Sequence, residues 1–361
     1  TLFRSFIRYF LEGMSKAMAT IEDILLLVEG LTPFEKDELR AKLMENRITA
    51  PSIEKLVSED RFSGGLVCPH CGCLGHIVRN GHRSDGRQRY KCRDCEKSFL
   101  AATNSIASGT RKELKVWKLY MECMINKLPI RKTAEICGIH RNTAFIWRHK
   151  ILDALQKVAN QTNLRGIIEA DETFFPLSFK GNHKHSSTFK MPRMAHKRGK
   201  AISTRGISKE QVCVPCAIDR TGNSLSRIAT LGRVRTKDLH KIYDGKIIDK
   251  SVFCTDKMNS YVRFAKSNGI ELVQLKTGKS KKGIYHIQHI NAYHSKLKAF
   301  IRIFKGVATK YLNNYLLWNN WINSSYGTLR ERVDRIIKVA LTTRITIKCA
   351  QLSCRPPVPL A

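Results

Sequence analysis

Four cysteines set as two close pairs are the residues whose types and spacing most clearly predict chemistry in this sequence. Twenty residues separate the two pairs, which are Cys68-x2-Cys71 and Cys92-x2-Cys95. Each Cys-x-x-Cys turn brings two thiolates to one side, and two facing turns complete a tetrahedral site of four sulfurs that suits Zn²⁺. The alternative is accidental pairing in a chain with twelve cysteines. We predict a structural zinc site and a zinc ribbon over residues 63–102.

The residues between the two pairs are typical of a ribbon hairpin. Asn80-Gly81 is a dipeptide that favours a hairpin turn, and residues 87–92 resemble a basic strand. Cys73 lies close to the four cysteines and is a competing ligand.

The composition predicts a polyanionic partner. Lysine and arginine total 64 against 30 acidic residues, which gives a formal charge of +34 and a pI near 10.0. So large an excess destabilises a compact fold by self-repulsion unless a polyanion neutralises it, and nucleic acid is the default partner. No apolar run approaches 18 residues, and residues 2–11 are too short and too interrupted by arginine for a signal peptide. We therefore expect a cytoplasmic, nucleoid-associated protein with reduced thiols and no membrane partner.

A helical stretch over residues 103–160 follows the ribbon. Apolar residues at helical spacing predict helices that end near Asn126, run from Ile130 to Cys137, and begin again near Arg141. Two helices joined by a glycine-containing turn, here at Gly138, favour a helix-turn-helix whose second helix enters the major groove. The alternative is an ordinary three-helix packing element. The candidate contacts to bases and phosphates are Arg141, Asn142, Arg148 and Lys150.

From residue 161 the pattern changes to alternating strands and helices. Residues 166–173 predict a buried strand in which Glu169 and Asp171 share one face while Glu172 lies on the other. An ionised acid in an apolar strand is costly unless it is paired or bound to metal, which makes Asp171 a site candidate. Asp256 closes a later strand, where α/β sheets usually place their chemistry.

This half also contains a third pair of close cysteines and a basic insertion. Cys213 and Cys216 lie in an apolar strand without a partner pair, and we expect both to be core thiols. Residues 176–209 contain nine lysines or arginines and no acid, including Lys197 and Arg198. This insertion is a candidate DNA-tracking arm, with a plain solvated loop as the alternative.

The order of hairpin strands, helix, strand, helix, strand and long helix is what a ribonuclease H-like core needs. With this order the chain resembles bacterial insertion-sequence transposases, the ISXO-like group that joins a zinc ribbon to a ribonuclease H-like DDE-type domain. The resemblance spans roughly residues 65–320. It rests on the segments 68–99, 168–173, 254–256, 289–298 and 306–318.

The resemblance implies a set of metal ligands and a reaction. In that group two strand aspartates and a third residue on the last helix hold divalent metal, which here correspond to Asp171, Asp256 and Asn291. Two Mg²⁺ or Mn²⁺ ions can then bind the attacking and the leaving oxygens of an in-line phosphoryl displacement. Water would cut at an element end, and the freed 3′-hydroxyl would attack target DNA.

Asn291 departs from an acidic triad, because its amide oxygen can bind a metal but brings no negative charge. Members of the group with asparagine at this position are known, so the substitution alone is not damage. His294 is a weaker candidate ligand, since Mg²⁺ prefers oxygen. Lys298 lies about two helical turns after Asn291 and faces the same side. It is a candidate for holding a DNA phosphate, with a solvated lysine as the alternative.

Together these features predict a multidomain α/β protein with a zinc ribbon, a helix-turn-helix and a ribonuclease H-like mixed sheet with flanking helices. We expect a transposase that acts on double-stranded DNA, both terminal inverted repeats and target, as a homo-oligomer. The alternatives are a non-catalytic sequence-specific DNA-binding regulator and a decayed transposase. The expected parts are an N-terminal helical segment (1–62), the ribbon (63–102), the helix-turn-helix (103–160), the catalytic domain (161–322) and a C-terminal tail (323–361).

Overall fold

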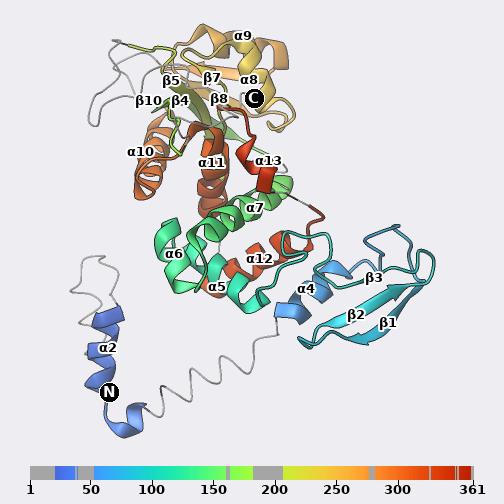
Figure 1. The fold of residues 1–361 in the computed structure, drawn as a ribbon. Coiled ribbons are helices and arrows are strands. Elements are labelled where there is room, and N and C mark those ends of the chain that lie inside the picture. The colour runs from blue at the N-terminus through green and yellow to red at the C-terminus, as the bar shows by residue number, and fades with distance from the viewer. Residues whose placement is uncertain are drawn as a thin grey trace. The chain divides into compact units, whose positions relative to one another are not determined.

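The computed structural model describes residues 21–36, 39, 53–159, 163–181, 206–275, 281–324, 327–345, 347 and 349–358. The chain divides into two compact units, residues 1–52 and 53–361. The first unit contains α2 (Ile21–Glu29). Beyond it, Thr32 and Glu35 exchange hydrogen bonds between backbone N–H groups and side chains, which is the reciprocal pattern of a capping box. The second unit contains the remaining described helices and all of the described strands (Figure 1).

The ribbon is a three-stranded antiparallel sheet of β1 (Ile77–His82), β2 (Gln88–Cys92) and β3 (Ser98–Phe99). The prediction of a hairpin turn at Asn80-Gly81 is wrong, because both residues lie within β1. There the register shifts between Arg79 and His82, and Gly81 takes a φ of 64° that suits an irregular strand position. The turn falls instead at residues 84–86, closed by the N–H of Arg83 donating to the carbonyl of Arg87.

The three helices expected after the ribbon are present as α5 (Leu114–Ile125), α6 (Ile130–Ile136) and α7 (Arg141–Ala159). They pack with α4 (Ile53–Arg61) and with α12 (Leu329–Thr342). Stacking of Trp117 on Trp147, with ring centroids 3.7 Å apart, joins α5 to α7.

The C-terminal region is not the tail that the sequence analysis expected. Residues 329–342 form α12, and residues 349–353 form α13 (Cys349–Ser353). Apolar side chains at helical spacing on α12 are wholly buried, among them Val333, Ile336 and Leu341. The amphipathic period explains the burial, because such a helix must cover its apolar face.

A mixed sheet forms the second half, with strand order β6-β5-β4-β8-β9 and β7 also paired to β5. β4 is central: it runs antiparallel to β5 and parallel to β8, and β9 continues parallel beyond β8. The strand bounds are β4 (Ile167–Pro176), β5 (Gln211–Asp219), β6 (Ser224–Ser226), β7 (Thr230–Leu231), β8 (Val252–Thr255) and β9 (Glu271–Gln274). This is the order of elements that the sequence predicted.

Helices cover both faces of this sheet (Figure 1). One face packs on α8 (Thr236–Tyr243) and α9 (Asn259–Asn268), and the other on α10 (Gln288–Ile303) and α11 (Thr309–Ser324). Alternation along β5 sends Cys213 to the first face and Cys216 to the second, and both are wholly buried, as expected of core thiols. A short hairpin of β10 (Lys281–Lys282) and β11 (Tyr285–His286) leads into α10.

Within the described parts of the chain, no helix is both long and apolar enough to cross a membrane. The central part of the basic insertion, with Lys197 and Arg198, lies outside the described residues.

Candidate functional site

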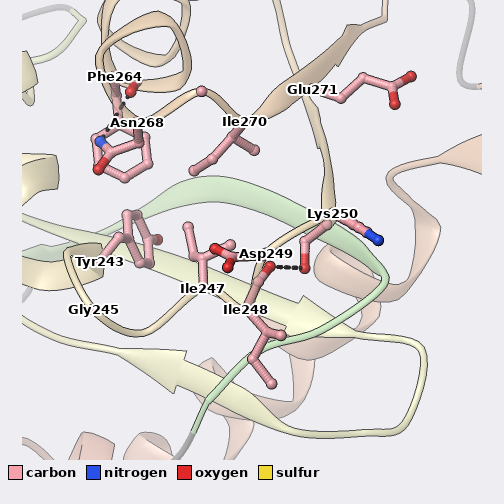
Figure 2. A pocket seen from close by; sticks show the side chains of 12 residues that line it. Tyr243, Gly245, Ile247, Ile248, Asp249, Lys250, Phe264, Asn268, Ile270 and Glu271 are labelled. Atoms are coloured by element: carbon pink, nitrogen blue, oxygen red, sulfur yellow. Dashed lines mark hydrogen bonds between the residues drawn. The ribbon is translucent and has the colours of Figure 1, made fainter.

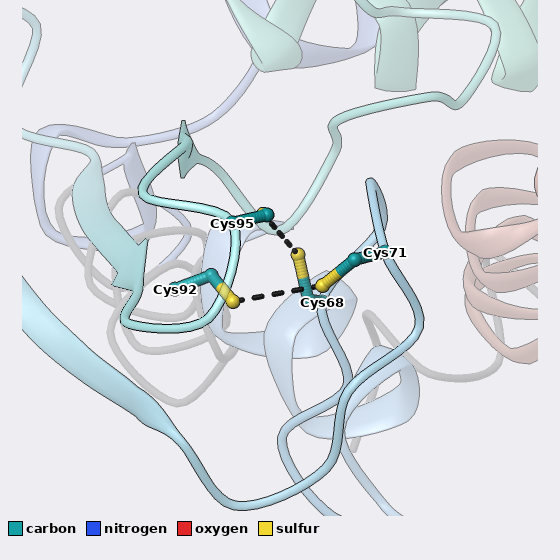
Figure 3. Close-up of side chains that lie close together, drawn as sticks. All are labelled: Cys68, Cys71, Cys92 and Cys95. Atoms are coloured by element: carbon teal, nitrogen blue, oxygen red, sulfur yellow. Dashed lines mark hydrogen bonds between the residues drawn. The ribbon is translucent and has the colours of Figure 1, made fainter.

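The four predicted zinc ligands converge on one point of the ribbon (Figure 3). Their sulfurs all lie within 4.8 Å of one another, and two of the separations are 3.7 Å, Cys68 to Cys95 and Cys71 to Cys92. A tetrahedral zinc site with Zn–S bonds of about 2.3 Å requires sulfurs about 3.8 Å apart. The cysteines therefore have the spacing that a structural Zn²⁺ needs.

Local backbone geometry supports these thiolates. The N–H of His70 donates to Cys68 Sγ at 3.4 Å, and hydrogen bonding from the backbone at Cys95 is the main cause that lowers the pKa of Cys92 to about 6. Cys73, the spare thiol, has its sulfur 3.1 Å from that of Cys92 and forms a second cluster with Cys92 and Asp94. Only Cys92 belongs both to this second cluster and to the set of four, so we assign Cys73 no ligand role.

The two predicted catalytic aspartates belong to neighbouring strands, Asp171 within β4 and Asp256 directly after the end of β8. β4 pairs with β8 in parallel register, with Glu169 opposite Cys254. Extending that register by two residues brings Asp171 level with Asp256, and side chains at matched positions of parallel strands share a face. Two carboxylates that are 85 residues apart in the chain are thereby placed side by side.

Burial disfavours the ionised form of both aspartates. Burial raises the pKa of Asp171 to about 6; the charge of Asp256 adds to the shift and that of Lys298 opposes it. Burial also raises the pKa of Asp256, and its Oδ1 is buried without a hydrogen-bond partner. A buried carboxylate oxygen with no donor is what an absent cation would leave, so these residues fit a divalent metal.

Helix α10 brings His294 and the charge of Lys298 close to Asp171, and it also carries Asn291. His294 Nδ1 lies 3.9 Å from Asp171 Oδ2, and burial lowers the pKa of His294 to about 4, which keeps the ring neutral at pH 7. Asn291 and Lys298 lie three residues before and four after His294, so all three share one helix face. Asn291 and Lys298 are exposed, and the Lys298 charge acts on Asp171.

Glu172, the neighbour of Asp171, faces the other side of the sheet, as alternation predicts. Burial raises its pKa to about 7, and its Oε1 has no hydrogen-bond partner. It packs on the side of α8 and α9, away from α10, so we leave it out of the metal-binding set.

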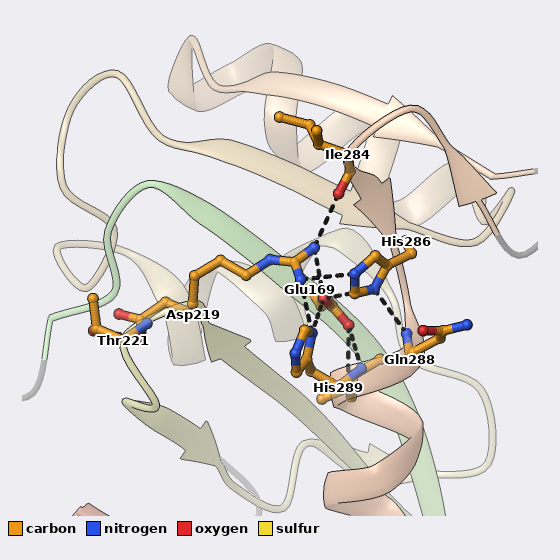
Figure 4. Close-up of polar contacts among 9 residues, drawn as sticks. Glu169, Asp219, Thr221, Ile284, His286, Gln288 and His289 are labelled. Atoms are coloured by element: carbon orange, nitrogen blue, oxygen red, sulfur yellow. Dashed lines mark hydrogen bonds and ion pairs between the residues drawn. The ribbon is translucent and has the colours of Figure 1, made fainter.

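Sequence reasoning missed the polar cluster around Glu169 (Figure 4). Glu169 is 1% exposed, and its carboxylate contacts three basic side chains, those of Arg220, His286 and His289. The acid in an apolar strand was the available signal, because it requires partners. The identity of these basic partners follows from the topology, which brings the start of α10 next to β4.

The predicted DNA contacts on α7 fall into two classes. Arg141 and Asn142 are exposed at the beginning of the helix, and Lys150 is half-buried. Arg148 is wholly buried, with its Nη2 donating to the Leu128 carbonyl at 2.7 Å and its guanidinium 4.9 Å from the Trp318 ring centroid. A side chain inside the core cannot reach a DNA groove, so the expectation of a DNA contact at Arg148 does not agree with the structure.

Replacing Arg148 by alanine is expected to lower the free energy of unfolding by about 2–4 kcal/mol, because it empties a buried volume and removes the hydrogen bond to Leu128. Arg141→Ala, on the exposed start of the same helix, should change it by no more than about 0.5 kcal/mol. Urea titration of both variants checks this. An Arg148→Ala protein as stable as Arg141→Ala would contradict the buried placement.

A pocket of about 680 Å³ lies elsewhere in the sheet domain, lined in part by Tyr243, Ser251 and Ile270 (Figure 2). Its residues precede β8 and β9, so it lies at the amino-terminal ends of these strands. Asp256 follows the carboxyl end of β8. The pocket is therefore separate from the pair of aspartates and takes no part in the site.

Comparison with known families gives two matches. Residues 163–321 match the ISXO2-like transposase domain, and residues 51–98 match the transposase zinc-ribbon domain. An uncharacterized protein in transposable element ISH50 of Halobacterium salinarum is 24% identical over 272 residues, covering 72% of this chain and 86% of that protein.

Among solved structures, the chain is similar to a pre-cleavage Mos1 transpososome, with 11% identity, a TM-score of 0.20, and coverage of 63% of this chain and 78% of that one. A Mos1 strand transfer complex matches at 10% identity and a TM-score of 0.21, over 64% of this chain and 78% of that one.

Proposed function

We propose that this chain, which matches the ISXO2-like transposase domain and the transposase zinc-ribbon domain, is a DNA transposase that cleaves the ends of its element and joins them to target DNA. The observation that carries the proposal is the parallel register of β4 and β8, whose extension makes Asp171 level with Asp256 just beyond β8, where Asp256 Oδ1 is buried and unpartnered. The strand order and the helices on both faces agree with a ribonuclease H-like catalytic core.

Each side chain has a role in this proposal. Asp171, Asp256 and the Asn291 amide oxygen would hold divalent metal, and the Lys298 ammonium would hold a DNA phosphate near them. When bound, Mg²⁺ or Mn²⁺ supplies charge neutralisation at the attacking and leaving oxygens. His294, 3.9 Å from Asp171, is neutral at pH 7 and so adds no positive charge beside the pair of acids.

The reaction follows from these placements. Water attacks a phosphodiester at the element end, the P–O3′ bond breaks, and the products are a 3′-hydroxyl and a 5′-phosphate. That hydroxyl then attacks a phosphodiester of the target, so one P–O bond forms as another breaks and no cofactor is consumed. The protein contributes position and electrostatics, and no covalent intermediate with the chain is required.

DNA recognition would use the parts ahead of the catalytic domain. We assign helices α6 and α7 to a helix-turn-helix, with Arg141 and Asn142 at the exposed start of the recognition helix and Lys150 near the phosphates. The insertion with Lys197 and Arg198 would follow the DNA backbone. Two ends must be brought together, so we expect a homo-oligomer on DNA.

The test is cleavage of a duplex that carries the element's terminal repeat, in Mg²⁺ or Mn²⁺, by the full-length chain and by Asp256→Ala. Removing one carboxylate should reduce cleavage by at least about 10³-fold, since a metal position is lost. End binding, measured by gel shift, should stay within about threefold, because the variant does not touch α7.

Two outcomes would favour rival functions. Specific end binding by the wild type with no nicking in either metal supports a non-catalytic DNA-binding regulator. If Asn291→Glu then gains cleavage, the chain is a decayed transposase whose neutral third ligand is the defect. If the wild type cleaves and Asp256→Ala cleaves equally, the assigned site is wrong.

A further inference from the structure

Helix α10 begins against a carboxylate that belongs to a strand. Glu169 Oε2 accepts hydrogen bonds from the backbone N–H groups of His289, at 2.8 Å, and Ile290, at 3.1 Å. The N–H groups in the first turn of a helix have no partner within the helix. At the boundary residue Ile287 no side chain caps α10, so Glu169 supplies the cap from β4. Its negative charge also suits the positive end of the helix dipole.

The carboxylate is held in place by basic side chains (Figure 4). Glu169 Oε1 lies 2.7 Å from His289 Nδ1, 3.0 Å from Arg220 Nη2 and 3.2 Å from His286 Nδ1. Arg220 Nη1 in turn lies 2.8 Å from His286 Nε2 and 2.9 Å from His289 Nδ1. Glu169 and the two histidines have the spacing of a metal site, but the guanidinium contacts all three and takes the place of a cation.

This cluster joins the two halves of the proposed metal site. Glu169 lies two residues before Asp171 on β4 and on the same face of the sheet. Ile290, whose N–H it binds, lies immediately before Asn291. One side chain therefore ties the strand that carries the first ligand to the helical turn that carries the third.

We propose that Glu169 is a positioning residue that fixes Asn291 relative to Asp171, and thereby sets the affinity of the site for divalent metal. The inference rests on the proposed function, because it takes Asn291 as a ligand. A neutral amide binds a cation more weakly than a carboxylate does. The affinity of the site for metal therefore depends more on how well the amide is placed than it would with a carboxylate as third ligand. Asn291 is exposed in the first turn of α10, where a helix frays unless its N–H groups are bound.

The decisive variant is Glu169→Gln, which keeps the shape and one acceptor oxygen but removes the charge. Loss of an outer partner of a metal ligand typically weakens metal binding by about 10- to 100-fold. We expect the Mn²⁺ concentration for half-saturation, measured by titration calorimetry, to rise about tenfold or more. Amide hydrogen exchange at residues 289–291 should become faster. At saturating Mn²⁺, DNA cleavage should recover most of the wild-type rate.

Asp238→Asn is the matched control. Asp238 is also a buried carboxylate at the start of a helix, where its Oδ2 accepts from the N–H of Arg235 at 3.0 Å, but it lies on α8. This variant should lose stability without any change in Mn²⁺ half-saturation. If both variants shift metal binding equally, or Glu169→Gln binds Mn²⁺ like the wild type, the positioning role is overturned.

Should Glu169→Gln fail to fold, Arg220→Gln tests the same role, because it leaves the backbone bonds to Glu169 and removes the cation that orients it. A rise in Mn²⁺ half-saturation of several-fold supports the proposal, and no rise rejects it. Metal binding and hydrogen exchange need no catalysis. A wild type that binds Mn²⁺ but cuts no DNA would therefore end the proposed function while leaving the role of Glu169 open to measurement.

Discussion

Asp171→Asn is expected to abolish metal-dependent DNA cleavage and, at the same time, to stabilise the metal-free protein. Burial raises the pKa of Asp171 from 3.8 to about 6, so the folded state binds this proton more tightly than the unfolded state does. Stability is therefore greatest below pH 4 for this group and is lost as the pH rises through about 6. At pH 7 the ionised carboxylate opposes folding, and asparagine removes that cost.

The expected gain is about 1–3 kcal/mol at pH 7, which discounts the shift of about two units because the side chain is 25% exposed. Cleavage should fall by at least about 10³-fold, since the amide cannot replace a charged metal ligand. Thermal unfolding in magnesium-free buffer measures the first effect, without a chelator, so that zinc is retained. The gain should shrink as the pH falls through about 6 and vanish only well below pH 3.8, where Asp171 is protonated in both states.

Asp249→Asn is a suitable control, because this carboxylate is exposed and lies at the other end of β8. It should change neither stability nor cleavage. An Asp171→Asn protein that is less stable than the wild type at pH 7 would show that the carboxylate is satisfied without a metal. Such a result would remove the physical reason for placing a cation beside it.

The sequence predicted the catalytic strands and their order because alternation and apolar runs are local signals. The strand pattern marked Asp171 and Asp256 separately as candidates, but their grouping as metal ligands came from the resemblance. Asn291 was assigned through the resemblance, which both family matches confirm at the level of the family, and Lys298 through its helical spacing from Asn291. Their role as ligand and phosphate contact stays a prediction.

What the sequence could not predict depends on contacts between distant segments. Arg148 resembles a DNA contact by type and position, and only the packing of α11 against α7 shows that Trp318 covers it. Glu169 was placed on the same strand face as Asp171 but given no role, because its partners Arg220 and His289 come from two other elements. The turn of the ribbon hairpin was misplaced because Asn80-Gly81 also suits a bulge, and hydrogen bonds at residues 83–87 decide between the two.

Removing one zinc ligand is expected to unfold the ribbon while the rest of the protein stays folded. The ribbon has its own small core of Cys68, Ile77, Tyr90, Cys92 and Phe99, which includes two of the ligands. So few apolar residues cannot stabilise a fold alone, and structural zinc contributes about 10–16 kcal/mol in comparable small domains. Cys92→Ser should therefore bind no zinc and become sensitive to trypsin over residues 63–102.

Cys73→Ser separates a specific loss of zinc from a general effect of losing a thiol. Its sulfur touches that of Cys92 but stands outside the set of four, so this variant should keep one zinc per chain and the wild-type trypsin pattern. Metal analysis of the two purified proteins decides the matter. If Cys73→Ser loses zinc and Cys92→Ser keeps it, the ligand set must be redrawn around Cys73. Because Phe62 packs on Tyr90 with ring centroids 5.2 Å apart, unfolding of the ribbon should also loosen the end of α4, but α5 and α7 should keep their protection from hydrogen exchange.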